Sequence, residues 1–142
     1  MNFLKKEKLV ILLLIALGFL FRWYLIRDNY FEFYYYQARD ADTSRAILEE
    51  ADLKIQGPAT SGTNDKIYNG VLYYYLTGPM YTLFKGDPMA PTLLLCLLSS
   101  LAIIPIYLIG KEIFKSKKIG LGAALLYAFS ADASQLGTWL GN

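Results

Sequence analysis

The residues best suited to chemistry in this chain are the charged and amide side chains between Gln37 and Asp42. A carboxylate such as Asp40 can act as a general base for an acceptor hydroxyl when it lies within hydrogen-bond reach. The neighbouring Arg39 can hold a phosphate through paired, charge-assisted hydrogen bonds. We therefore take Asp40 as the first candidate catalytic residue and Asp42 as the second. Gln37 and Arg39 are candidate substrate-binding residues.

The two acidic candidates are not expected to work as a pair. Residues two apart on a helix point about 200° away from each other, so Asp40 and Asp42 would face different surroundings. The same run of charges also fits the solvated face of a loop helix, and its spacing alone favours that simpler interpretation.

Three further candidates for substrate binding precede a tyrosine-rich segment. Lys66, Tyr68 and Asn69 can contact a lipid phosphate or a sugar, although anchoring at a membrane interface is the simpler explanation for the tyrosine. Histidine is absent from the chain, which excludes histidine metal ligands and histidine general bases. The sequence shows no metal site and predicts no cofactor, and it leaves open a divalent metal to which one carboxylate contributes a ligand.

The elements that must position these residues belong to a membrane protein. Of the 142 residues, 55% are hydrophobic, and they form long apolar blocks separated by charged clusters, which is typical of membrane-spanning chains. The net charge is only +2, so we do not expect nucleic acid as a partner. We expect membrane lipid as a partner, because of the apolar blocks.

We expect an all-α integral membrane fold with about three transmembrane helices and additional extracytoplasmic juxtamembrane helices. The expected segments are a cytoplasmic N-terminus (1–8), a first span (9–27), an outer loop (28–90) with helices at about 38–51 and 67–84, a second span (91–110), a basic cytoplasmic loop (111–118) and a third span (119–142).

Charge bias predicts the orientation of these spans. Lysines cluster at residues 5–8 and again at 111–118, and such clusters stay in the cytoplasm. An even number of crossings must therefore separate them, and the first two spans supply that number. The tyrosine-rich segment 71–84 is then expected to lie in the outer interface, with an ordinary short span as the alternative. This places the protein in the inner or plasma membrane with a cytoplasmic N-terminus.

Two local details of the spans are also predicted. Arg22 lies near the end of the first span, where its side chain can extend towards the interface and so avoid the bilayer centre. Pro105 lies inside the second span and is expected to kink that helix.

Four stretches carry a resemblance to a known family: Gln37 to Asp40, Gly57 to Ser61, Asn69 to Leu76 and Gly110 to Ser130. Their order and spacing resemble the N-terminal part of bacterial membrane glycosyltransferases of the GT-C class. They are most similar to the protein mannosyltransferases and aminoarabinose transferases, that is, to glycosyltransferase family 39. The resemblance covers nearly the whole chain.

The resemblance implies transfer of a hexose or pentose from a polyprenyl-phosphate donor to a lipid, glycan or protein acceptor at the outer face of the membrane. It further implies an aspartate of the first loop as general base, with inversion at the anomeric carbon. Related sequences often have aspartate where this chain has Tyr36 and histidine where it has Asn69.

The number of spans bears on whether this chain can act alone. Members of the class have many more spans than this chain, so the resemblance implies an inactive N-terminal fragment of a larger polytopic GT-C fold. The alternative is a small multi-pass membrane adaptor or assembly subunit without catalysis.

Overall fold

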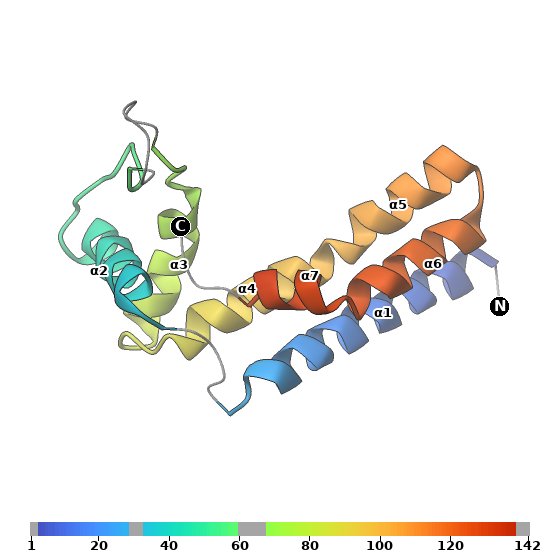
Figure 1. Cartoon of the computed structure of the whole chain (residues 1–142), viewed down its shortest axis with the longest axis horizontal. Helices are drawn as coiled ribbons and strands as arrows, with labels where there is room; N and C mark the ends of the chain where they lie inside the picture. The colour runs from blue at the N-terminus through green and yellow to red at the C-terminus, as the bar shows by residue number, and fades with distance from the viewer. Residues whose placement is uncertain (1–2, 29–32, 60–67, 139–142) are drawn as a thin grey trace. The chain divides into compact units, whose positions relative to one another are not determined.

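The computed structural model describes residues 3–28, 33–59 and 68–138. Its regular elements are helices (Figure 1): α1 (Phe3–Ile26), α2 (Tyr35–Glu49), α3 (Leu72–Leu83), α4 (Met89–Leu101), α5 (Ile103–Phe114), α6 (Lys117–Ala128) and α7 (Ala131–Leu136). These residues contain no β-strand, and an isolated antiparallel bridge joins Ala59 to Tyr68. The expected all-α class is confirmed for this part of the chain.

The chain divides into two compact units. The first, which we call the bundle unit, contains α1, α5, α6, α7 and the end of α4. The second, which we call the loop unit, contains α2, α3 and the start of α4.

Two helical segments in the described residues are long and apolar enough to cross a membrane. They are Lys6–Ile26, with 21 residues, and Met89–Phe114, with 26 residues. Only 22% and 28% of their most apolar stretches are buried inside the protein. A core helix of a soluble protein would be mostly buried, so this exposure is compatible with helices that face lipid.

The second of these segments is interrupted near its middle. The regular helix breaks at Ala102, between α4 and α5. Pro105 explains the break, because a proline has no N–H to donate to the carbonyl four residues earlier and its ring crowds that carbonyl.

The block expected to form the third span is divided into α6 and α7. Ser130 separates them, and its side-chain oxygen accepts a hydrogen bond from the N–H of Ala133 at 3.3 Å, which caps the start of α7. The 12 residues of α6 rise only about 18 Å, less than the roughly 30 Å hydrocarbon core. Residues 139–142 of the expected span lie outside the described residues, so a third crossing stays a prediction.

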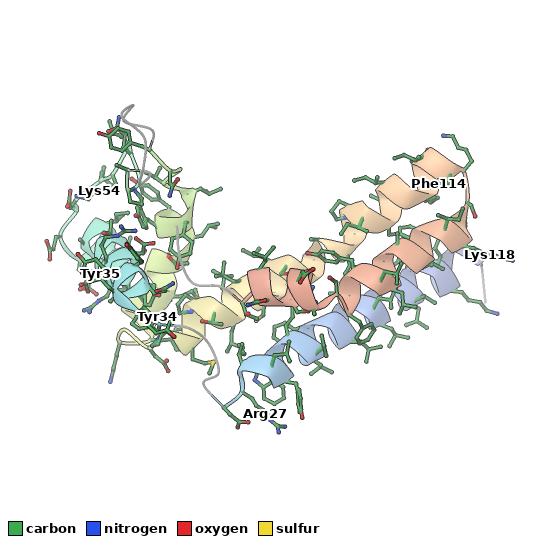
Figure 2. The ribbon with its side chains drawn as sticks, in the orientation of Figure 1. Arg27, Tyr34, Tyr35, Lys54, Phe114 and Lys118 are labelled. Atoms are coloured by element: carbon green, nitrogen blue, oxygen red, sulfur yellow. The ribbon has the colours of Figure 1, made fainter. Side chains whose placement is uncertain are left out.

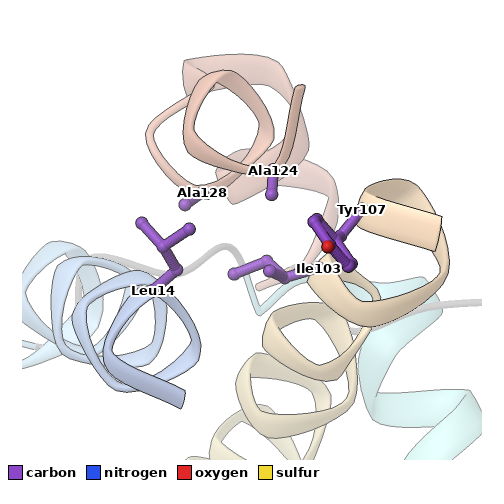
Figure 3. Close-up of a cluster of buried hydrophobic side chains, with 5 residues drawn as sticks. All are labelled: Leu14, Ile103, Tyr107, Ala124 and Ala128. Atoms are coloured by element: carbon purple, nitrogen blue, oxygen red, sulfur yellow. The ribbon is translucent and has the colours of Figure 1, made fainter. Parts of the chain in front are cut away.

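A small apolar core holds the bundle unit together. It is formed by Leu14 of α1, Ile103 and Tyr107 of α5, and Ala124 and Ala128 of α6 (Figure 3). The α6 residues in this core are alanines, which let the backbones of neighbouring helices approach closely.

The helices α5 and α6 approach each other closely at two glycines. A Cβ atom added to Gly120 would lie 2.7 Å from the carbonyl oxygen of Tyr107, and one added to Gly110 would lie 3.1 Å from the Cα of Gly120. Small residues at such a contact allow tight packing of apolar helices.

Polar contacts fix one end of the bundle unit, which we call the basic end. Near the start of α1, Glu7 accepts a hydrogen bond from Tyr107 and forms ion pairs with Lys111 of α5, at 3.3 Å, and with Lys117 of α6. The beginning of α1 therefore lies beside the end of α5 and the beginning of α6. The lysines of residues 111–118 are thus gathered at the same end of the unit as the start of the chain's first helix.

Arg22 does not extend towards the surface as the sequence led us to expect. Its side chain is fully buried, and it donates hydrogen bonds to Ser99 Oγ at 3.1 Å, to the carbonyl of Gly18 at 3.0 Å and to the carbonyl of Ala128 at 3.2 Å. The guanidinium also lies 5.4 Å from the ring centroid of Tyr127. Partners on α1, α4 and α6 thus accept hydrogen bonds from Nε and Nη1, whereas among the described residues the buried Nη2 atom has no hydrogen-bond partner.

The two helices of the loop unit differ in extent from the expected ranges of 38–51 and 67–84. The first begins earlier, at Tyr35, because Gln37 Oε1 accepts a hydrogen bond from the N–H of Tyr34 at 3.0 Å and caps the first turn. It ends at Glu49, two residues before Ala51, which has a left-handed backbone with φ of 55°. The second helix covers Leu72–Leu83.

Candidate functional site

The candidate site lies where α2 and α3 pack against each other in the loop unit. Small and polar residues make this contact. The hydroxyls of Ser44 and Thr77 are 3.1 Å apart, and a Cβ added to Gly78 would lie 2.6 Å from the carbonyl oxygen of Ser44. Only glycine permits this approach, so Gly78 determines how closely α3 lies to the polar face of α2.

Asp40 is the buried charge in this contact. Its carboxylate has no solvent exposure. Its Oδ1 atom accepts hydrogen bonds from Arg39 Nε at 2.9 Å, from Arg39 Nη2 at 2.6 Å and from the hydroxyl of Tyr74 at 3.2 Å. A buried carboxylate is stable as an anion only when it is paired and hydrogen-bonded in this way.

The partner guanidinium reaches towards solvent. The side chain of Arg39 is 33% exposed and its guanidinium carbon lies 5.5 Å from the ring centroid of Tyr36. Partial burial on its own lowers the pKa of Arg39, but the hydrogen bonds and charge of Asp40 more than offset this and raise it. Arg39 is therefore a permanent cation, positioned by Asp40, with part of its surface available to another anion.

Two further tyrosine hydroxyls are buried near this charge. The hydroxyls of Tyr73 and Tyr81 are both buried, and each phenol influences the pKa of the other. Burial, reinforced by the negative charge of Asp40, raises the pKa of Tyr81 to about 12 and also raises the pKa of Tyr73. Both phenols are therefore neutral at physiological pH and can donate a hydrogen bond.

The structure separates the two acidic candidates, in agreement with the helical spacing. Asp40 is buried against α3, whereas Asp42 is exposed. They do not form a carboxylate pair. At the start of α2, side chains also differ in exposure. Gln37 is buried and caps the helix, whereas Tyr34 and Tyr35 are exposed (Figure 2).

Tyr36, at the position where the resemblance to GT-C glycosyltransferases implied an aspartate, is 63% exposed. In this chain the buried carboxylate is supplied by Asp40 four residues later. Within the described residues, Asp40 is thus the acidic candidate that the fold surrounds with donors.

The candidates before α3 occupy a different part of the loop unit. Asn69 pairs with the Gly57-Pro58 turn through its backbone: its N–H donates to the Pro58 carbonyl at 3.0 Å, and its carbonyl accepts from the Gly57 N–H at 3.0 Å. The side chains of Tyr68 and Asn69 are exposed. Lys66 lies outside the described residues. The structure therefore does not bring Tyr68 or Asn69 into hydrogen-bond contact with Asp40.

The tyrosines near Asp40 were not predicted from the sequence as part of the site. The tyrosine-rich run indicated interface anchoring, whereas Tyr74 and Tyr81 turn inwards and are almost fully buried. Their separation of seven residues, with Thr77 and Gly78 between them, is a helical repeat. That repeat was the available signal for a polar packing face. In the described residues no three acidic or cysteine side chains gather as metal ligands.

No family model matches this chain, and neither a curated protein nor a solved structure matches it. The resemblance to GT-C glycosyltransferases therefore rests on the sequence motifs alone.

Proposed function

We propose that this chain belongs to a membrane glycosyltransferase that moves a hexose or pentose from a polyprenyl-phosphate donor to an acceptor at the outer membrane face. The observation that carries the proposal is the buried Asp40 carboxylate, held by Arg39 and Tyr74 at the contact between two helices too short to span. This arrangement places the carboxylate of Asp40 beside the partly exposed guanidinium of Arg39. A general base for the acceptor hydroxyl and a cation for the departing phosphate both assist sugar transfer from a lipid phosphate.

The charge distribution supports a multi-pass arrangement with a cytoplasmic N-terminus. Glu7 ties Lys111 and Lys117 to the start of α1, so the two basic clusters share one end of the bundle unit. Basic clusters favour the cytoplasm. With the basic end on that side of the inner or plasma membrane, an even number of crossings separates the clusters and the loop unit lies outside.

The exposed face of α3 supports its proposed position in the outer interface. The side chains of Leu72, Tyr75, Leu76 and Leu83 are 40–71% exposed. They form an apolar stripe on the exposed side of α3, whereas Tyr74, Thr77, Gly78 and Tyr81 are its buried residues. An apolar stripe on a short helix suits burial at headgroup depth.

In the proposed reaction, an acceptor hydroxyl attacks the anomeric carbon while the bond from that carbon to the lipid-phosphate oxygen breaks. Asp40 takes the proton of the hydroxyl, and the departing phosphate keeps the bonding electron pair. Arg39 stabilises the negative charge on that phosphate. Because Asp40 is fully buried, the acceptor reaches it only after a rearrangement of the side chains that cover it.

Photolabelling of the chain in liposomes with a photoreactive polyprenyl-phosphate sugar tests the proposal. We expect labelling within residues 35–83 that unlabelled donor suppresses and that free polyprenol does not. Arg39→Gln should weaken labelling, whereas Arg45→Gln, on the same helix, should not, because Arg45 pairs with Glu49. Labelling that unlabelled donor fails to suppress would contradict the proposal.

Transfer itself is measured in membranes of cells that express the gene. Asp40→Asn should abolish transfer, because an amide cannot accept the proton, while donor labelling persists. Asp42→Asn should leave transfer unchanged, since Asp42 is exposed on another face of α2. Full transfer by the Asp40→Asn protein would contradict the assignment of the base.

A membrane adaptor without catalysis is the second candidate function. The observation in its favour is that Asp40 and Gln37 are both buried and both serve helix packing or capping. An adaptor would show no donor-specific labelling, and Asp40→Asn would then alter only the stability of the loop unit. The labelling experiment thus separates the two functions.

A further inference from the structure

A cavity opens between α1 and α6 at the basic end of the bundle unit. Its volume is about 220 Å³, and it is lined by Lys6, Glu7 and Val10 of α1 and by Lys117, Lys118 and Leu121 of α6. Lys118 lies at the start of α6 (Figure 2). The cavity therefore combines a cationic rim with two aliphatic side chains one helical turn further along.

The charges of the rim are not balanced within the unit. Glu7 is engaged by Lys111, Lys117 and Tyr107. In the part of the chain that the structure describes, neither Lys6 nor Lys118 forms an ion pair, and both are exposed. Two of the lysines that line the cavity thus have exposed ammonium groups that no carboxylate of the described residues pairs with, and such groups attract an anion.

The aliphatic side chains of Val10 and Leu121 indicate which class of anion fits the cavity. Val10 is 40% exposed and Leu121 is partly buried against the core. Exposed leucines continue along both helices, at positions 13 and 17 of α1 and 125 and 126 of α6. A small phosphate ion would use the ammonium groups but leave this apolar surface uncovered. A lipid with an anionic headgroup uses both parts, because its acyl chain covers the leucines.

We infer that this cavity binds the phosphate headgroup of an anionic phospholipid, with Lys6 and Lys118 as its cationic contacts and an acyl chain over Val10 and Leu121. Basic pockets between helices at the cytoplasmic surface are suited to such lipids. The inference is independent of glycosyl transfer, since none of the Asp40 cluster takes part in it.

The test measures lipid binding to the purified 142-residue chain in detergent by native mass spectrometry. We expect phosphatidylglycerol to be retained in preference to phosphatidylcholine, and inorganic phosphate at the same concentration not to displace it. Displacement by inorganic phosphate would overturn the lipid assignment in favour of a free-anion site. Equal retention of the two lipids would overturn it as well.

Paired variants separate the cavity from the general positive charge of this end. Lys6→Gln with Lys118→Gln should weaken phosphatidylglycerol binding roughly thirtyfold, because each lysine near an anionic headgroup contributes about a factor of five. Lys8→Gln with Lys115→Gln removes the same charge from residues that do not line the cavity. That control should stay within about a factor of two of the parent chain. Equal losses in both pairs would overturn the inference.

A third variant tests the apolar part without changing the charge. Val10→Trp should fill the cavity and weaken phosphatidylglycerol binding, while circular dichroism shows unchanged helix content. Val10 is outside the apolar core of the unit, so the substitution is compatible with folding. Unchanged binding by a folded Val10→Trp protein would overturn the proposed placement of the acyl chain.

Discussion

At the scale of single residues, a substitution at Tyr74 tests whether its hydroxyl stabilises the buried carboxylate of Asp40. The hydroxyl donates to Asp40 at 3.2 Å in a buried setting. A hydrogen bond to a charged group contributes about 1.5–3 kcal/mol, so we expect Tyr74→Phe to lower the unfolding free energy of the loop unit by about that amount. Hydrogen exchange of the α2 and α3 amides measures the change.

Tyr75→Phe is the matched control for that substitution. The hydroxyl of Tyr75 donates to the carbonyl of Lys54 at 2.9 Å, but in an exposed position. Its loss should cost no more than about 1 kcal/mol. Equal protection in the two variants would show that Tyr74 does not stabilise Asp40.

Arg22 is the second case at this scale. Its buried guanidinium joins α1 to Ser99 and to the end of α6. We expect Arg22→Gln to destabilise the bundle unit by roughly 2–3 kcal/mol, since about 1 kcal/mol is lost with each hydrogen bond that cannot re-form. Thermal unfolding in detergent measures it. Arg27→Gln removes an exposed arginine of the same chain segment, and its unfolding midpoint should match that of the parent chain.

At the scale of elements, the glycines of α6 decide how closely two helices pack. A Cβ on Gly120 would lie 2.7 Å from the Tyr107 carbonyl, whereas a Cβ on Gly122 would meet nothing within 4 Å. We expect Gly120→Ala to separate α5 from α6 and to cost about 1–3 kcal/mol. Gly122→Ala should be neutral or stabilising by up to about 1 kcal/mol, because alanine favours helix. Thermal unfolding compares the two variants. Equal stability of the Gly120→Ala and Gly122→Ala proteins would contradict the close contact between α5 and α6 at Gly120.

The sequence predicted some helices better than others. The helices α1, α2 and α3 follow from local patterns of apolar and polar residues, and their observed ends differ where a side chain caps a turn, as Gln37 does for α2. The division of the third apolar block at Ser130 was not foreseen. A capping hydroxyl in an otherwise apolar run changes the helix locally, but it hardly alters the hydropathy of the window around it.

At the scale of the whole molecule, the proposed orientation can be measured with single cysteines. Native Cys96 is buried, so its background reaction with a membrane-impermeant maleimide should be low. We expect Asp42→Cys to react in intact cells and Lys8→Cys to react only after the membrane is opened. The reverse pattern would place the basic end outside and would remove the support for an outer loop unit.

The sequence by itself determined the apolar segments, the basic clusters and the choice of Asp40 over its neighbours as first candidate, because these depend on composition and short spacing. Only the tertiary structure decided what surrounds those residues. Tyr74 is 34 residues from Asp40 and Ala128 is 106 residues from Arg22. Local hydropathy and helical spacing carry no information about such partners, because burial of a charge depends on donors and acceptors that distant segments bring to it.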